Sequence, residues 1–583
     1  MKYSDCIADW LCHLGYSHCF FVGGGNIMHL VESLSRKMTC VPVIHEVAAG
    51  IAAEYFNETN PTHKALALVT AGPGLTNLVT AVAGAYMESR ELLILGGQVK
   101  RSDLALGKVR QRGIQEIDGV SLLKSITVHS ERVDAPMAYD AFVDRVMKSK
   151  SGRNGPVFLE FPIDVQGAPV EFVMPDALPT LISLPGANVW DVQAVVERIR
   201  LAQRPLILVG GGVDRLVAAR VFDQWTELPI ATTWNGADRI SATHPAYVGR
   251  PNTWGQRRAN LILQQSDCVI ALGTRLGLQQ TGFNWQEFVP CGDVIQVDLD
   301  RGELEKGHPH IAMGVCADAN DFLVQLSHSD LGEHSEWMAY VRHIIATLPL
   351  IEPINHTGDA YISPYEFVDE LSRRCEVSDV IVPCSSGGAF TVMMQVFQQQ
   401  LGQVIVTNKG MASMGYGLSG AIGAAFANPD KRTILIEGDG GFAQNLQEIG
   451  TAAIHNLNLK MFIFDDSGYA SIRMTQRNYF GGRYVGCDRD TGLGLPRWDA
   501  LFTAWDVPVL RITKGFELTD SFNQLFNKPG IAAFVVSIDP EQTYLPKITS
   551  RILETGVIVS NPLHLMTPDL GVEKMNSVGK YFA

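Results

Sequence analysis

Short apolar runs alternate with longer helical segments along nearly the whole chain, and this pattern indicates the fold class. The runs are rich in Val, Ile and Leu and are continuous rather than alternating, as at 19–22, 65–70, 206–209, 269–272 and 461–464. Continuous apolar strands are typical of parallel sheets that are covered on both faces. Strands of this kind followed by helices predict an α/β chain made of doubly wound parallel sheets.

Two stretches with clustered Pro and Gly and little periodicity, residues 172–188 and 347–364, are predicted to be linkers. They divide the chain into units at 1–171, 189–346 and 365–545, followed by a tail at 546–583. A chain of 583 residues is too long for one ordinary domain, and each unit has the size of a doubly wound domain. Ligands of such domains bind beyond the carboxyl ends of the strands, so the loops there are the places to search.

Composition narrows the class of partner and the compartment. The formal net charge is −14 and no run of Lys or Arg occurs, which argues against a nucleic-acid partner. The longest apolar runs are strand-sized, so no membrane span is expected. Acidic residues interrupt the first fifteen positions early, unlike a signal peptide. Ten cysteines without a Cys-x-x-Cys pair then predict a reduced, cytoplasmic protein.

The most informative segment runs from residue 433 to residue 469. One buried strand ends in the Gly-Asp-Gly-Gly turn at 438–441, a helix is expected over about 444–455, and a second strand ends at Asp465 and Asp466. The 24 residues from 441 to 464 are about what a helix and a return strand require in a parallel unit. Asp439 and Asp466 should therefore emerge at one edge of one sheet. Two carboxylates beside glycines suit Mg²⁺ shared with a phosphate group, whereas a tight turn with a helix cap is the simpler alternative.

This spacing resembles the diphosphate–magnesium motif of the thiamine-diphosphate enzymes, which usually reads Gly-Asp-Gly and then, 24–28 residues later, Asn-Asn. On that resemblance the metal would be held by Asp439, by the side chain of Asp466 and by the carbonyl of Gly468. This chain departs from the pattern because Asp465-Asp466 replaces Asn-Asn. Aspartate is an equally competent oxygen ligand but adds negative charge opposite a diphosphate. Metal binding is therefore expected to survive with an altered affinity.

Near the N-terminus, Glu46 lies where a strand meets a helix of small residues. A lone glutamate in the first turn of a helix is favoured by the helix dipole, and this is the plainer interpretation. Thiamine chemistry, however, needs a carboxylic acid against N1′ of the aminopyrimidine, where it favours the tautomer that deprotonates C2. The matching position in the family, after a His in the acetolactate synthases, is this glutamate. The resemblance thus implies that Glu46 is the catalytic acid.

Three further segments carry the same resemblance. Residues 70–77 resemble the Ser-Gly-Pro-Gly-x-Thr-Asn turn of the pyrimidine domain, with Ala71 in place of the Ser, and residues 22–25 resemble its Pro-Gly-Gly turn. In the loop at 410–417, Met414 fits the apolar wedge that bends the cofactor, although a core methionine is the alternative. The cofactor-binding residues implied are Gly24, Gly25, Pro73, Asn77, Ser386, Gly387, Ala412, Met414, Gly438, Gly440, Gly441 and Ser467.

The resemblance is closest to the acetolactate synthase-like branch. Residues 97–99 and 114–116 match its Gly-Gln-Val strand end and its Phe-Gln-Glu loop, with Ile114 in place of the Phe. Gln115 is thus a candidate for orienting the donor keto acid or the developing alkoxide. The run at 469–476 lacks the branch's Trp and is similar to ketone-accepting acetyl transferases of branched-sugar and surface-polysaccharide pathways. Arg473 in this run is interpreted as a substrate clamp or as a solvated cation on a helix.

The middle unit gives a weaker signal. The glycines at 210–212 lack the third glycine of the dinucleotide fingerprint, because position 215 is Arg. Arg275 and Asp298 lie in segments that resemble those holding FAD in the acetolactate synthase group. FAD with a structural rather than a redox role is the ligand that this resemblance suggests, although many relatives leave the domain empty or bind another nucleotide there.

The resemblance therefore implies pyrimidine-binding, central and diphosphate-binding domains and a carboligase that uses thiamine diphosphate and Mg²⁺. Its donor would be a 2-keto acid, with pyruvate as the best guess, and its acceptor an aldehyde or ketone. Active sites would lie at the subunit interfaces of a homodimer or homotetramer, with the tail folded over the entrance. The alternatives are acetolactate synthase proper, a non-oxidative decarboxylase, an acyl-transferring oxidase and a catalytically dead cofactor-binding protein. A decarboxylase needs a proton donor, and the chain has no His-His pair.

Overall fold

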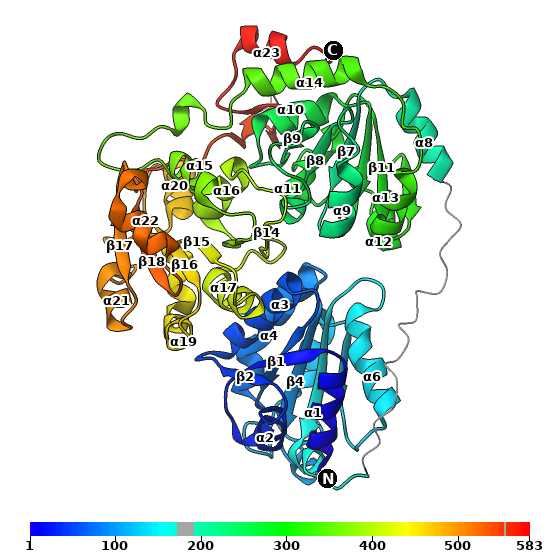
Figure 1. Ribbon diagram of the computed structural model, residues 1–583, viewed down its shortest axis with the longest axis vertical. Helices are drawn as coiled ribbons and strands as arrows, with labels where there is room; N and C mark the ends of the chain where they lie inside the picture. The colour runs from blue at the N-terminus through cyan, green and yellow to red at the C-terminus, as the bar shows by residue number, and fades with distance from the viewer. Residues whose placement is uncertain (172–191, 553–554, 583) are drawn as a thin grey trace.

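A computed structural model describes residues 1–171, 192–552 and 555–582, and it contains three six-stranded parallel sheets with helices around each (Figure 1). Alternate residues of one strand face two different cores: Ala65 and Ala67 pack on one side of the first sheet, and Leu66 and Leu68 on the other. Both faces are thus buried, as a doubly wound sheet requires. The predicted fold class is confirmed. The predicted linker at 172–188 lies outside the described residues.

In the first sheet, the direction in which successive strands are added reverses next to the first strand of the chain. Its strands are, in spatial order, β2 (Thr39–Pro42), β1 (Tyr16–Phe21), β3 (Lys64–Val69), β4 (Leu92–Gln98), β6 (Pro156–Pro162) and β5 (His129–Arg132). The chain leaves β1 toward one edge and β3 toward the other, so a crevice forms above these two strands. The helices are α1 (Tyr3–His13), α2 (Met28–Leu34), α3 (Glu46–Thr59), α4 (Pro73–Met87), α5 (Gly119–Leu123), α6 (Tyr139–Met147) and α7 (Ile163–Gln166).

The third sheet repeats the strand order of the first. It runs β14 (Val404–Ile405), β13 (Val380–Pro383), β15 (Thr433–Gly438), β16 (Leu459–Asp465), β18 (Ala532–Ser537) and β17 (Val509–Ile512). Its switch point therefore lies between β13 and β15. The helices are α15 (Pro364–Arg374), α16 (Gly387–Val396), α17 (Tyr416–Ala427), α18 (Asp439–Phe442), α19 (Ile449–Ile454), α20 (Ala470–Tyr479), α21 (Trp498–Ala504) and α22 (Asp520–Asn527).

The middle sheet has a different order, that of dinucleotide-binding folds. It runs β12 (Met313–Cys316), β11 (Asp293–Asp298), β10 (Cys268–Leu272), β7 (Pro205–Val209), β8 (Ile230–Thr232) and β9 (Tyr247–Gly249). At its switch point, a side chain on Gly210 would collide with the carbonyl of Gly273. The helices are α8 (Val192–Leu201), α9 (Arg215–Phe222), α10 (Arg257–Gln265), α11 (Leu278–Thr281), α12 (Arg301–Glu305), α13 (Ala319–Leu326) and α14 (Ser335–Thr347).

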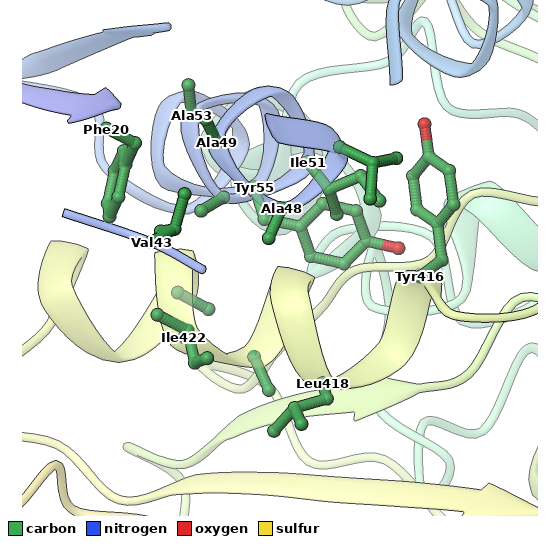
Figure 2. Packing of buried hydrophobic residues seen from close by; sticks show 14 of the residues in the cluster. Phe20, Val43, Ala48, Ala49, Ile51, Ala53, Tyr55, Tyr416, Leu418 and Ile422 are labelled. Carbon is green, nitrogen blue, oxygen red and sulfur yellow. The ribbon is translucent and has the colours of Figure 1, made fainter. Parts of the chain in front are cut away.

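The first and third units meet where α3 lies beside α17 (Figures 1 and 2). Both helices are buried along most of their length, and both consist largely of small and apolar residues. Small residues let their backbones approach, because a side chain on Gly423 would overlap the backbone of Ala52. Figure 2 shows Tyr55 pointing toward α17, and its ring centroid lies 6.1 Å from that of Tyr416. One apolar core thus continues from the first unit into the third.

The described residues after 545 pack on the middle unit. Two short antiparallel pairs form there, β19 (Lys547–Ile548) with β22 (Met566–Thr567) and β20 (Ser550–Ile552) with β21 (Ile558–Ser560). The last helix, α23 (Val572–Val578), lies beside α14 (Figure 1), and Val578 shares a core with Trp337. A position over the active site stays a prediction. Among the described helices, none is both long and apolar enough to cross a membrane.

Candidate active site

An open, glycine-lined space lies at the switch point of the third sheet. Pro383 at the end of β13 pairs with Ile436 of β15, so the turns that follow the two strands are neighbours. One turn contains Ser386 and Gly387, where α16 begins, and the other contains Gly438. A side chain on Gly387 or Gly438 would meet no described atom within 4 Å. Free space at the N-terminus of a ten-residue helix suits a phosphate group.

Two acids lie together beside this space, as the spacing predicted. Gly438 pairs with Phe464 across adjacent strands, so Asp439 and Asp466 leave the sheet at the same edge, and both are buried. Asp439 Oδ2 accepts the Gly468 N–H at 3.0 Å. Burial and the negative charge of Asp466 raise the pKa of Asp439, and burial raises the pKa of Asp466 to about 7. A divalent cation bound between them would favour the ionised form of both carboxylates.

A metal ion bound by Asp439 and Asp466 would need a further protein ligand that is not an acidic, His or Cys side chain. No group of three or more His, Cys, Asp or Glu side chains that could hold a metal occurs among the described residues. Backbone oxygen is the remaining kind of donor, and the loop after β16 has an unusual backbone, because Ser467 has φ +64° and Gly468 has φ +152°. A side chain on Gly440 would collide with the ring of Tyr469, which keeps this glycine close to the loop. The donor set fits a hard cation such as Mg²⁺.

The neighbouring acid has a different partner. Asp465 lies 3.2 Å from the Arg511 guanidinium, so it forms an ion pair of its own. One of the two interpretations of Arg473 is wrong, because the side chain is only 4% exposed, which excludes a solvated cation. Its Nε and Nη2 groups donate to Asp466 and to the carbonyl of Pro540, and a role as a substrate clamp stays a prediction.

The helix expected over 444–455 is interrupted. The chain forms α18, a 3₁₀ segment over Ala443–Glu448, and then α19, with non-helical angles at Asn445. The break lets Asn445 Nδ2 donate to the Gly415 carbonyl at 2.7 Å. This bond links the segment after the turn at 438–441 to the loop that contains Met414. The hydrophobic pattern of the sequence gives no sign of the bond.

Glu46 is the first residue of α3, and its side chain is half-buried. Asn77 Nδ2 of α4 donates to Glu46 Oε2 at 2.9 Å. The preceding residue, His45, caps the helix by accepting the N–H of Val47. The structure therefore joins two of the predicted site residues, Glu46 and Asn77, through a direct hydrogen bond.

A buried acid of the third unit holds the backbone next to Glu46. Glu448 accepts the N–H of Ile44 at 3.1 Å and the N–H of His45 at 3.0 Å, and Thr451 donates to its second oxygen at 2.7 Å. Sequence reasoning missed Glu448. The two partners are 403 positions apart, and a glutamate nine residues after Asp439 has no distinguishing local signal.

A cleft of about 370 Å³ lies between the first and third units. The first unit contributes Ile44, His45, Val47, Asn77 and Thr80, and the third contributes Ser413, Met414, Gln444, Asn445 and Gln447. Met414 is 36% exposed, so it is not a core methionine. In the same loop Ala412 has φ +53°, a left-handed conformation that costs a non-glycine residue energy and often marks a functional site.

The loop that contains Ala412 and Met414 is held from outside its own unit. Glu88, at the end of α4, accepts the backbone N–H groups of Lys409 and Gly410, and Asn235 of the middle unit donates to its other oxygen at 2.6 Å. All three units therefore meet behind this loop.

The remaining residues predicted in the first unit lie at its switch point. A side chain on Gly24 would collide with Thr70, and a side chain on Gly72 would collide with the backbone of Gln115. Gln115 is exposed and has φ +60°. Gly25 begins a 3₁₀ turn, and Pro73 is the first residue of α4. The structure gives no contact between Gln115 and Glu46.

The residues predicted in the middle unit follow two adjacent strands, because Leu272 of β10 pairs with Val297 of β11, but each has a different hydrogen-bond or ion-pair partner. Arg275 Nη2 lies 3.9 Å from Glu88, whereas Asp298 accepts the N–H of Asp300 at 3.0 Å. Arg153 of the first unit pairs with Asp300 at 2.8 Å. The acidic segment after β11 is thus already engaged by another unit.

Comparison with known proteins agrees with this geometry. Three family models match the chain: the thiamine pyrophosphate enzyme N-terminal TPP binding domain at 1–122, the central domain at 192–326 and the C-terminal TPP binding domain at 386–536. The chain is 28% identical to the acetolactate synthase isozyme 1 large subunit of Escherichia coli K12, over 92% of this chain and 94% of that protein. It is 28% identical to the acetolactate synthase large subunit of Corynebacterium glutamicum, over 90% and 84%.

Proposed function

Because this chain belongs to the thiamine pyrophosphate enzymes, we propose that it decarboxylates a 2-keto acid and transfers the acyl unit to an aldehyde or ketone. The observation that supports this most is the cleft between the units. There Asn77, which holds the Glu46 carboxylate, lines one wall, and Met414 lines the other. Bound thiamine diphosphate (thiamine pyrophosphate) supplies a carbon nucleophile and an electron sink.

In this proposal each residue of the cleft would have its own role toward the cofactor. Glu46 holds the proton at N1′ of the aminopyrimidine, and Asn77 keeps its carboxylate in place. Met414 would support the cofactor, and the Ala412 carbonyl would accept a hydrogen bond from its amino group.

The diphosphate would lie in the glycine-lined space of the third unit. Asp439, Asp466 and the Gly468 carbonyl would hold Mg²⁺, whose charge offsets that of the two acids and the diphosphate. The groups around the phosphates would be Ser386, Gly387, Gly438, Gly440, Gly441 and Ser467. Support comes from the buried acid pair and from the open space at Gly387 and Gly438.

Pyruvate is the donor that we favour, since the similar proteins of known activity are acetolactate synthases. The acceptor is proposed to be a ketone or aldehyde other than a second pyruvate, because the run at 469–476 lacks a Trp. Arg473 no longer supports that argument, because it is buried against Asp466. Gln115 remains the candidate for orienting the donor.

Assembly, FAD and compartment are further parts of the proposal. A homodimer or homotetramer is proposed from the family, although one chain here supplies both walls of the cleft. FAD would have a structural role near Arg275, in a unit whose strand order suits dinucleotides. All ten cysteines lie in the described ranges as free thiols, which supports a reducing, cytoplasmic location.

The test is an incubation with thiamine diphosphate, Mg²⁺ and pyruvate, alone and with a panel of ketones and aldehydes. The proposal expects CO₂ release that rises with one acceptor class, together with the corresponding α-hydroxyketone. Acetolactate formed from pyruvate alone would indicate acetolactate synthase proper. Free acetaldehyde as the main product would indicate a simple decarboxylase, and no CO₂ release with any acceptor would contradict the proposal.

A further inference from the structure

The metal site that we propose contains one negative charge more than the family motif provides. Asp466 stands where that motif has an asparagine. Its side chain is buried, and the other acid of the pair, Asp465, has an ion pair of its own with Arg511. The extra charge of Asp466 therefore needs its own compensation, since a buried ion without a partner is costly.

Arg473 is placed to provide that compensation. Arg473 Nη2 lies 2.9 Å from Asp466 Oδ1 and also donates to the Asp466 carbonyl at 2.6 Å. The same side chain donates through Nε to the Pro540 carbonyl at 3.2 Å. One guanidinium thus holds both the side chain and the backbone of Asp466.

The position of Arg473 is otherwise unfavourable. It lies in the first turn of α20, where the helix dipole repels a cation, and it is buried, which removes the guanidinium from water. Another arginine of the same helix, Arg477, is only half-buried and avoids much of that cost. The ion pair with Asp466 accounts for the placement of Arg473.

We infer that Arg473 is a positioning residue that makes Asp466 act as a neutral, one-oxygen ligand, in place of the family's asparagine. Arg473 occupies Oδ1 and leaves Oδ2 for the cation. The pair carries no net charge, so the site keeps the single negative charge, that of Asp439, which an aspartate–asparagine site would have. This inference rests on the proposed function, because it presumes that the site binds a cation with a diphosphate.

Binding of thiamine diphosphate with Mn²⁺, followed by the EPR signal of free Mn²⁺, tests the inference without any turnover. Arg473→Met should weaken joint binding by roughly 10-fold to 100-fold, the usual effect of losing a group that orients a metal ligand. Asp466→Asn added to Arg473→Met should restore most of that loss, because a neutral ligand needs no compensating cation. Arg477→Met is the matched control, since this half-buried arginine of the same helix pairs with Glu541 instead of Asp466, and the variant should bind as the parent does.

A purely structural role for Arg473, through the Pro540 carbonyl, predicts no rescue by Asp466→Asn. Equal binding by Arg473→Met and its double variant, or parental binding by Arg473→Met, would overturn the inference. If Arg473→Met does not fold, Arg473→Lys takes its place: binding near the parent's level supports the charge argument. Weak binding by that variant with no rescue by Asp466→Asn overturns it. A parent that binds no thiamine diphosphate with Mn²⁺ would instead reject the proposed function.

Discussion

Glu448 Oε1 lies 3.0 Å from the backbone nitrogen of His45, so a buried acid of the third unit fixes the first unit directly before Glu46. Glu448→Ala should leave the N–H groups of Ile44 and His45 without this partner, at a cost of about 1–3 kcal/mol. We expect kcat for pyruvate decarboxylation to fall by roughly 10-fold or more, since catalysis depends on placement within about an ångström.

The matched control is Thr451→Val, which removes one hydrogen bond to Glu448 but leaves both of its backbone contacts. It should change kcat far less. Parental kcat in Glu448→Ala would show that this acid does not position Glu46.

Asn77 is predicted to set the orientation of the Glu46 carboxylate. Asn77→Ala removes a hydrogen bond of 2.9 Å, worth about 1 kcal/mol, so kcat should fall by roughly 5-fold. Asn77→Asp should be worse, because a second carboxylate beside Glu46 disfavours its charged form. Steady-state kinetics would check this order, and Thr76→Ala, next to it on α4, is the control. Equal rates for both Asn77 variants would argue against electrostatic coupling with Glu46.

The contact between α3 and α17 gives a prediction about stability. In an ordinary helix Gly→Ala stabilises by about 1 kcal/mol. Gly423→Ala should do the opposite, by about 1–3 kcal/mol, because the added methyl group would overlap the backbone of Ala52. Thermal unfolding would measure the change. Gly494→Ala, whose methyl group meets no described atom within 4 Å, should leave Tm unchanged. A higher Tm for Gly423→Ala would mean that the helices are not in close contact.

Glu160 on β6 predicts a pH dependence of stability. Burial raises its pKa to about 7, against the opposing influence of Arg132. The folded state then binds more protons than the unfolded state between about pH 4.5 and pH 7. Stability should therefore fall as pH rises through this range, by about 3 kcal/mol from this group. Glu160→Gln does not titrate, so its Tm relative to the parent should rise from pH 5 to pH 8. A constant difference in Tm would contradict this assignment.

Much of the fold could be predicted because it is encoded locally. The run at 461–464 lies within β16, and the predicted adjacency of Asp439 and Asp466 follows from the length of one helix and one return strand. Doubly wound sheets leave little choice once such units are recognised. The break at Asn445 could not be predicted, because the bond that accompanies it is made to the Gly415 carbonyl, thirty residues earlier in the chain.

Some residues of the candidate site could likewise be predicted from local motifs, and others could not. Glu46, Asn77 and Met414 are found by local motifs, and the structure brings their segments to one cleft. Arg473 was misinterpreted because a cation on an amphipathic helix gives no sign of its burial or of its bond to Asp466. Glu448 and Glu88 were missed because they act across units, on the backbone of residues hundreds of positions away. Contacts of this kind depend on packing between units, which periodicity does not report.

The most direct test of the account is release of CO₂ from pyruvate by the parent protein and by Glu46→Gln, with thiamine diphosphate, Mg²⁺ and a ketone acceptor present. Glutamine retains the size of Glu46 and its contact with Asn77 but cannot exchange a proton at N1′. The account predicts turnover by the parent and loss of nearly all of it in Glu46→Gln, with binding of the cofactor retained. Turnover by Glu46→Gln at the parental rate would contradict it.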